Sequence, residues 1–265
     1  MGNILMTIIS LVLVCACGSF SYAADVLLLG DGDAETQVQT ALENAGHNVT
    51  YGGLYNNWNG STPNPNNFDV IVVLDGEGYG EEFTPTATSA LSNFVGRGCG
   101  LIFTEWTAWD VCSGYKGPTI GELLPVTTPV SGCPYDYTNT WTVLNTSHPL
   151  TAGVPNSWSD SAGWTEVTAK PGSTVLISGT NSNPLLTFST VNRGTVVHIN
   201  HEMTYTTDTI NANALQLIAN AVEFSSGCRR RATEAVPTMT EWGMIIFIAL
   251  AGLGSAYFLR RQRRA

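Results

Sequence analysis

The sequence predicts a doubly wound α/β domain that is followed by one C-terminal transmembrane helix. Between residues 25 and 104, apolar strand-like runs alternate with helical segments, which is the pattern of a parallel sheet covered by helices. The stretch 243–259 contains no charged side chain, and arginines follow it at once. A run of this length is just long enough to cross a bilayer core, and the arginines favour a cytoplasmic C-terminus.

The N-terminus has the features of a secretory signal peptide. An apolar run from Ile4 to Val14 precedes small residues, and Ser21-Tyr22-Ala23 offers a cleavage site, so we expect residues 1–23 to be removed. No Lys or Arg precedes the apolar run, which is unusual for such a peptide. Lipidation at Cys17 and retention of the segment as an anchor are the alternatives.

Residues 24–226 form the predicted ectodomain, and its first half supplies the parallel sheet. Apolar runs that end at glycine or polar residues predict strands at 25–30, 47–51, 69–75 and 98–104. Helical spacing predicts one helix over 34–45, where Gly46 is a stop signal. A second helix is expected from Pro85 to Gly96, with Thr84 as its N-cap.

The second half of the ectodomain, beyond Cys133, is richer in Thr, Ser and Trp. Its predicted strands are short and lie near 140–144, 174–178, 185–190 and 195–200. A last helix is expected over 211–224. Residues 227–235 are mostly small or polar, as in a linker.

The ectodomain is strongly acidic. Residues 24–228 contain 19 Asp and Glu against four basic side chains, which gives a formal charge of −15. This charge argues against nucleic acid as a partner and against adhesion to anionic surfaces. It is compatible with binding of divalent cations, and equally with solubility alone.

Four cysteines remain after residue 23, and an even number in an exported protein suggests two disulfides. Cys112 and Cys133 flank a loop rich in Gly and Pro, so we favour this pair. Cys99 with Cys228 would then tie the sheet to the last helix. The chain has no C-x-x-C pair after residue 23, so a zinc site is the weaker alternative.

A specific motif precedes the apolar C-terminal stretch. It consists of Val236, Pro237, Thr238, Met239, Thr240, Glu241, Trp242 and Gly243. Together with the helix and the arginine cluster, it resembles the IPTL-CTERM sorting signal of exosortase substrates, in which Ile, Leu and Ser stand in place of Val236, Met239 and Thr240. The resemblance covers only residues 236–265.

This resemblance implies an envelope protein of a Gram-negative bacterium. The protein would be anchored in the inner membrane with its ectodomain in the periplasm, and an exosortase would then process it near Pro237. It would end at the cell surface or in the extracellular matrix. A buried core helix in place of the membrane span, and a general protease in place of the exosortase, are the alternatives.

The order of elements from Asp25 to Phe224 resembles the class I glutamine amidotransferase-like fold, which has a flavodoxin-like sheet. The resemblance is carried by the segments 69–75, 96–103, 147–150 and 193–197. The catalytic Cys of that family lies on the turn after the strand that ends here at Thr104, but this chain has Glu105 there. Since a catalytic triad needs its nucleophile, amidotransfer is not supported.

Polar side chains follow several of the predicted parallel strands. In open α/β sheets, ligands bind at the carboxyl ends of the strands. Those ends carry Asp31, Asp33, Asp75, Glu77, Glu105, His201 and Glu202. This set could hold Ca²⁺, Mg²⁺ or Mn²⁺, or supply an acid–base pair that hydrolyses glycosidic or ester bonds. The alternative is a rim of solvated acidic loops.

Aromatic residues are frequent before the C-terminal motif, and exposed rings could stack on sugars. They include Trp58, Trp106, Trp109, Trp141, Trp158 and Trp164, with Tyr51, Tyr55, Tyr79 and Tyr115. The alternative is ordinary packing in the core and loops.

These features predict a secreted, anchored envelope protein with a non-catalytic ectodomain that serves as a binding or surface-matrix module. A metal-assisted or acid–base hydrolase acting on glycans is the alternative. The expected partners are an exosortase, the inner membrane and an exopolysaccharide, without nucleic acid. The sequence establishes no cofactor, and a divalent cation is the one candidate.

Overall fold

The structure is a computed structural model that describes residues 23–32, 34–76, 80–129, 132–203 and 209–228, with the single positions 248, 251, 252, 260 and 262. The chain divides into a unit of residues 1–227 and a unit of residues 228–265. The predicted signal peptide, the motif at 236–243 and most of the predicted membrane span lie outside the described residues. Within the described ranges, no helix is long and apolar enough to cross a membrane.

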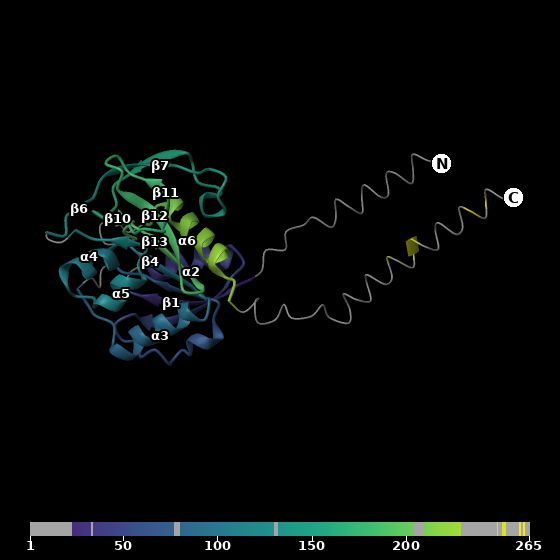
Figure 1. Cartoon of the computed structure of the whole chain (residues 1–265), viewed down its shortest axis with the longest axis horizontal. Coiled ribbons are helices and arrows are strands. Elements are labelled where there is room, and N and C mark those ends of the chain that lie inside the picture. Colours follow the sequence, from purple (N-terminus) through teal and green to yellow (C-terminus); the bar gives the residue numbers. More distant parts are fainter. Residues whose placement is uncertain are drawn as a thin grey trace. The chain divides into compact units, whose positions relative to one another are not determined.

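A nine-stranded mixed sheet forms the centre of the first unit (Figure 1), in the order β2-β1-β3-β4-β13-β12-β11-β7-β8. Five neighbouring strands are parallel, namely β2 (Asn48–Leu54), β1 (Asp25–Gly30), β3 (Val70–Val73), β4 (Gly100–Thr104) and β13 (Gly194–Ile199). Four strands extend the sheet in antiparallel fashion, namely β12 (Pro184–Val191), β11 (Thr174–Ser178), β7 (Asn139–Val143) and β8 (Ser157–Asp160). The predicted α/β class is confirmed.

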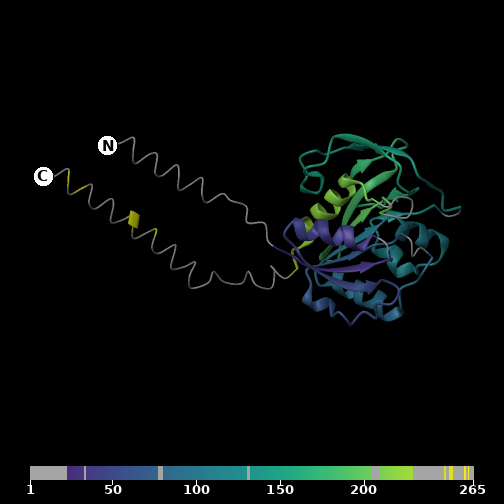
Figure 2. The same ribbon diagram turned by 180° about the vertical axis from the view of Figure 1, so that it is seen from behind.

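Helices cover both faces of the parallel strands (Figures 1 and 2). On one face, α2 (Glu35–Asn44) and α6 (Ala212–Ser225) share an apolar cluster with alternate strand residues such as Val26, Val72 and Val197. The intervening strand residues point to the opposite face, because side chains alternate along a strand. There they are covered by α3 (Pro85–Gly96). Hence both faces of the parallel strands are buried, which explains their continuous apolar runs.

The sequence signals that predicted the start of α3 are confirmed. The side chain of Thr84 accepts a hydrogen bond from the Ala87 amide, and Pro85 stands in the first turn, as predicted. Every predicted strand and helix of the ectodomain is found, with ends that differ by at most three residues.

Several short elements were not predicted. They are the helices α4 (Trp106–Ser113) and α5 (Pro118–Leu123), the single turns η1 (Pro65–Asn67) and η2 (Pro149–Thr151), the four-residue edge strand β8, and the two-residue strands β5 (Val126–Thr127), β6 (Tyr135–Asp136), β9 (Trp164–Thr165) and β10 (Thr168–Ala169). Elements this short give no hydrophobic period, so a pattern search does not find them.

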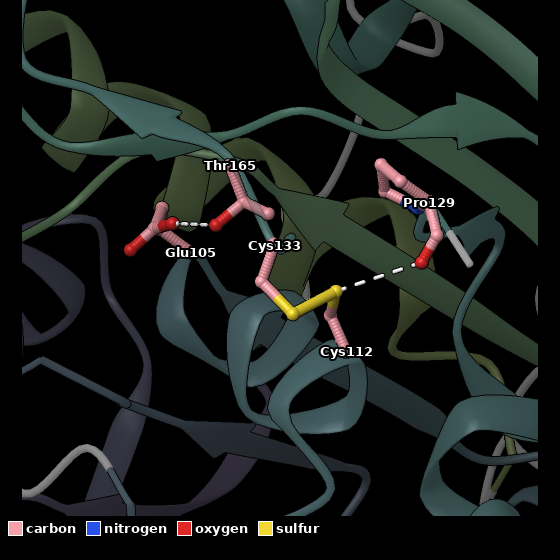
Figure 3. Close-up of a disulfide and its surroundings, with 5 residues drawn as sticks. All are labelled: Glu105, Cys112, Pro129, Cys133 and Thr165. Atoms are coloured by element: carbon pink, nitrogen blue, oxygen red, sulfur yellow. Dashed lines mark hydrogen bonds between the residues drawn. A yellow bond between two sulfur atoms is a disulfide. The ribbon is translucent and has the colours of Figure 1, made fainter. Parts of the chain in front are cut away.

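The predicted disulfide between Cys112 and Cys133 is present and joins α4 to the segment just before β6 (Figure 3). Their Cα atoms lie 5.5 Å apart. Cys99 and Cys228 are disulfide-bonded as well. All four cysteines of the predicted framework are therefore oxidised.

Gly194 allows α3 and β13 to approach closely. A Cβ atom at this position would lie 2.5 Å from the carbonyl oxygens of both Val95 and Cys99. Because these are backbone atoms, they can move only if the end of α3 moves. We therefore expect Gly194→Ala to lower the free energy of unfolding by about 1–3 kcal/mol, as other overpacked sites do, in urea denaturation.

Gly96 provides the matched control for this prediction. It lies at the end of α3, and an added Cβ atom would meet nothing within 4 Å. We expect Gly96→Ala to leave stability unchanged or to raise it by up to about 1 kcal/mol. Equal stabilities of the two variants would contradict the close approach at Gly194.

Candidate functional site

The carboxyl ends of the parallel strands bring five of the predicted site residues to one edge of the sheet. Asp31 follows β1, Asp75 follows β3, Glu105 follows β4, and His201 with Glu202 follows β13, and these four strands are neighbours. All five side chains are buried, with exposures of 8% or less. The edge is therefore a buried polar layer and not an open acidic rim.

Asp33 and Glu77, the other two predicted members of this edge, lie outside the described residues. Among the residues that the structure describes, no group of three or more His, Cys, Asp or Glu side chains could hold a metal ion. The described residues therefore add no support to the hypothesis of a metal site.

Asp75 belongs to a buried ion-pair network centred on Lys116. The Lys116 Nζ lies 2.7 Å from Asp75 Oδ2 and also contacts Asp110 Oδ2, and all three side chains are fully buried. Nζ also donates to the Tyr55 hydroxyl at 3.2 Å and lies 4.4 Å from the centre of that ring. These contacts offset the desolvation of the ammonium group.

Asp110 accommodates the excess negative charge of this network. Burial, and next the charge of Asp75, raise the pKa of Asp110 to about 7, although Lys116 opposes the shift. The Gly80 amide donates to Asp110 Oδ1 at 2.8 Å, and Lys116 Nζ donates to the Glu81 carbonyl at 3.2 Å. The network thus also fixes the chain at Gly80 and Glu81.

Glu105 stands on the turn between β4 and α4, where the sequence resemblance places a nucleophile. Its Oε1 accepts a hydrogen bond from the Thr165 hydroxyl (Figure 3). Burial raises the pKa of the fully buried Glu105 well above its ordinary value, the Thr165 hydrogen bond opposes this, and the charges of Asp75 and Glu202 add to it. Burial therefore favours the protonated form of Glu105 over the carboxylate.

The backbone of this turn also differs from that of a nucleophile elbow. Glu105 has φ −48° and ψ −62°, which is ordinary right-handed helical geometry. An elbow instead holds its nucleophile on a sharp, strained turn with the side chain exposed. The turn here is relaxed and points a buried side chain toward Thr165.

Both ring nitrogens of His201 are engaged. Its Nε2 lies 2.9 Å from Asp160 Oδ2, and its Nδ1 lies 2.5 Å from the carbonyl oxygen of Glu202. Burial raises the pKa of Asp160, but the hydrogen bonds from His201, Trp141 and Trp158 outweigh it and lower that pKa. The two ring nitrogens of His201 therefore face a backbone carbonyl and Asp160, both inside the protein. Neither nitrogen is left free to contact a substrate.

The segment 163–167 is held over this edge by hydrogen bonds. Glu202 Oε2 accepts from the Gly163 amide at 2.7 Å. Asn200 exchanges two hydrogen bonds with the backbone of Thr165, at 2.8 and 3.0 Å. A Cβ atom on Gly163 would lie 2.6 Å from Glu202 Oε2, so the close approach requires glycine. These bonds place Thr165 against Glu105.

An aromatic surface, defined here as Trp109, Tyr115, Tyr135 and Tyr137, lies beside the edge. The rings of Trp109 and Tyr115 are nearly parallel, with centroids 5.9 Å apart. Tyr135 lies edge-on to Trp109 at 6.5 Å and to Tyr137 at 5.7 Å. Tyr115 and Tyr135 are 48% and 50% exposed. This surface offers accessible ring faces, whereas Trp58 and Trp141 are core residues.

The sequence interpretation missed the partners of the predicted residues, namely Lys116, Asp110, Tyr55, Thr165, Asp160 and Asn200. One signal was available for Lys116, because the acidic ectodomain has only four basic side chains. A lone cation among many carboxylates is a good candidate for a buried ion pair.

No protein-family model matches this chain, and no curated protein is significantly similar to it. Solved structures share its fold. A cytoplasmic protein from Salmonella typhimurium matches with a TM-score of 0.61 and 18% identity, over 76% of this chain and 98% of that chain. A ThuA-like protein from Bacteroides uniformis matches with a TM-score of 0.56 and 16% identity, over 77% and 93%.

A β-galactosidase from Rahnella matches with a TM-score of 0.52 and 11% identity, over 80% of this chain but 32% of that chain. At such identities the likeness shows the fold alone. This chain therefore shares an α/β fold with the ThuA-like protein and the Salmonella protein.

Asp110 makes the stability of the protein depend on pH. Its pKa is about 7 in the folded protein, against an ordinary value of 3.8. Between about pH 4 and pH 7 the folded state therefore keeps a proton that the unfolded state has released, and the stability from Asp110 falls as pH rises. The side chain introduced by Asp110→Asn cannot ionise, so the variant should lack this loss of stability at higher pH. Between pH 4 and pH 7, the difference in free energy of unfolding between the variant and the wild type should therefore move by a few kcal/mol in favour of the variant, at about 1.36 kcal/mol per pKa unit.

Urea denaturation at several pH values measures this difference. Asp136→Asn is the matched control, because it removes a carboxyl group that is exposed and lies outside the Lys116 network. A stability difference between Asp110→Asn and the wild type that stays constant from pH 4 to pH 7 would show that Asp110 ionises normally.

Proposed function

We propose that the chain is an exported protein of a Gram-negative cell envelope, with a non-catalytic ectodomain that binds exopolysaccharide. A C-terminal helix would anchor it in the inner membrane until an exosortase releases it to the cell surface or matrix. The observation that carries the non-catalytic part is Glu105. At the position where the resembled family has its nucleophile stands a fully buried carboxyl group that accepts a hydrogen bond from Thr165.

The side chains that are accessible on the ectodomain support a binding role. The edge carboxylates are buried, Asp75 pairs with Lys116, and the His201 ring contacts Asp160 inside the protein. The aromatic surface, by contrast, exposes Tyr115 and Tyr135. The apolar C–H faces of sugar rings pack on such rings, and the charge of −15 favours a neutral polymer over an acidic one.

Three features support export and anchoring. The apolar run at 4–14 is typical of a signal peptide, and the oxidised cysteines fit an oxidising compartment. The motif at 236–243, with its apolar stretch and arginines, supports sorting by an exosortase.

A hydrolase acting on glycans is the second candidate. The raised pKa of Glu105 favours it, because a neutral carboxyl group at neutral pH is what a general acid needs. The complete burial of Glu105 opposes it, since a general acid must reach the substrate. Release of reducing sugar by the wild type, lost in Glu105→Gln while binding persists, would favour the hydrolase.

The sorting proposal predicts the fate of motif variants. We expect Pro237→Ala and Trp242→Ala to accumulate as the unprocessed, membrane-bound form, because both residues match the resemblance motif. Immunoblots of membrane and surface fractions measure processing, in host strains with and without the exosortase. Thr240→Ser, which restores the family residue, is the control and should be processed normally. Processing that continues without the exosortase would indicate a general protease.

The binding proposal predicts a loss at the aromatic surface. We expect Trp109→Ala and Tyr135→Ala each to weaken retention by a neutral polysaccharide at least about tenfold, equal to about 1.4 kcal/mol, in affinity electrophoresis. Tyr51→Ala is the matched control, because Tyr51 is 45% exposed but lies on the edge strand β2. Equal retention of all three variants and the wild type would remove the aromatic surface from the proposal.

A further inference from the structure

A cavity of about 510 Å³ lies beside β9 and β10, and it shares no residue with the sheet edge or the aromatic surface. Its volume falls in the range of about 300–1,000 Å³ that is typical of small-molecule sites. Trp164, which lines it, is the neighbour of Thr165 in β9, and adjacent strand residues point to opposite sides. The cavity is therefore separate from the surroundings of Glu105.

One wall of the cavity includes Trp164, whose ring is fixed and largely buried, because only 9% of the residue is exposed. The Trp164 Nε1 donates to the carbonyl of Thr138 at 3.3 Å, and its ring packs perpendicular to Trp141 with centroids 6.3 Å apart. Val167 and Pro184 add apolar surface beside it. A ligand would meet this wall without having to order it first.

The opposite wall is a tight loop that is tied to the first wall. The Ser182 amide donates to the Gly179 carbonyl at 3.0 Å, and Ser182 has a φ of 60°, in the left-handed region. The side chain of the buried Asn183 accepts from the Val167 amide at 2.8 Å and donates to the Thr165 carbonyl at 3.1 Å. Because Asn183 joins the two walls, the cavity is preorganised and binding loses little conformational entropy.

The lining selects the chemistry of a ligand. The apolar lining residues form one part of the cavity wall. The other part has side chains that can form hydrogen bonds with a ligand, namely Glu166, Thr168, Asn181 and Ser182. No Lys or Arg is among the lining residues, and Glu166 adds a carboxylate, so an anionic ligand is disfavoured. A neutral sugar ring has the matching form, because its C–H face is apolar and its hydroxyls point outward.

We propose that this cavity binds one neutral monosaccharide unit, as a subsite separate from the aromatic surface. The C–H face of the sugar packs on the half-buried Val175 and the accessible part of Trp164, and its hydroxyls meet Asn181, Ser182 and Glu166. This inference rests on the proposed glycan-binding function and names a specific site for it. The aromatic surface would hold the polymer by stacking, while the cavity would select the sugar.

The test titrates the full chain in mild detergent with glucose, galactose, mannose, N-acetylglucosamine and glucuronate, by calorimetry. We expect one neutral sugar to bind in a 1:1 ratio, and glucuronate to bind at least tenfold more weakly. Val175→Phe places a larger side chain in the cavity and should weaken the sugar at least tenfold. Val191→Phe is the matched control, because Val191 is half-buried on the neighbouring strand β12 and does not line the cavity.

Thermal unfolding shows whether Val175→Phe is folded, and Asn181→Ala is a milder second variant because Asn181 is exposed. No binding of any neutral sugar, full affinity in folded Val175→Phe, or tighter binding of glucuronate would each overturn the cavity proposal. Tyr135→Ala separates the two sites, because it should lose polysaccharide retention and keep monosaccharide binding. Monosaccharide binding without any polysaccharide retention would uphold the cavity and defeat the exopolysaccharide function.

Discussion

The buried ammonium group of Lys116 is the constraint on which this end of the molecule depends. It joins Asp75, at the end of β3, to Asp110 on α4 and to Tyr55 after β2. Breaking a buried pair leaves an uncompensated charge, at a cost of about 3–5 kcal/mol, so the three segments hold one another in place. The position of α4 then fixes both the turn at Glu105 and the ring of Trp109.

With these three segments held together by Lys116, the carboxyl edge of the sheet forms an internal polar layer. Glu105 is fully buried beside Thr165, and the ring nitrogens of His201 contact Asp160 and a backbone carbonyl. These are the strand ends at which open α/β sheets usually bind ligands. Here the same positions stabilise the segment 163–167, and the accessible groups lie further out, on the aromatic surface and in the cavity beside β9.

The sequence predicts the parallel strands well because their physical signal is local. A strand such as Val70–Val73, buried on both faces, reads as a continuous apolar run, and Thr84 with Pro85 marks a helix start within two residues. The edge residues were also predictable, since topology alone brings strand ends together. Their partners were not, because Thr165 reaches Glu105 across sixty positions of sequence. No local pattern records such a contact.

The geometry of the aromatic surface depends on oxidation of Cys112 and Cys133 to a disulfide. Trp109 lies on the helix that carries Cys112, and Tyr135 follows Cys133 by two residues, so one covalent bond sets the spacing of these rings. In a reducing compartment the two segments are joined by weaker contacts only. The surface is therefore completed by oxidation, a step that under the export proposed above follows departure from the cytoplasm.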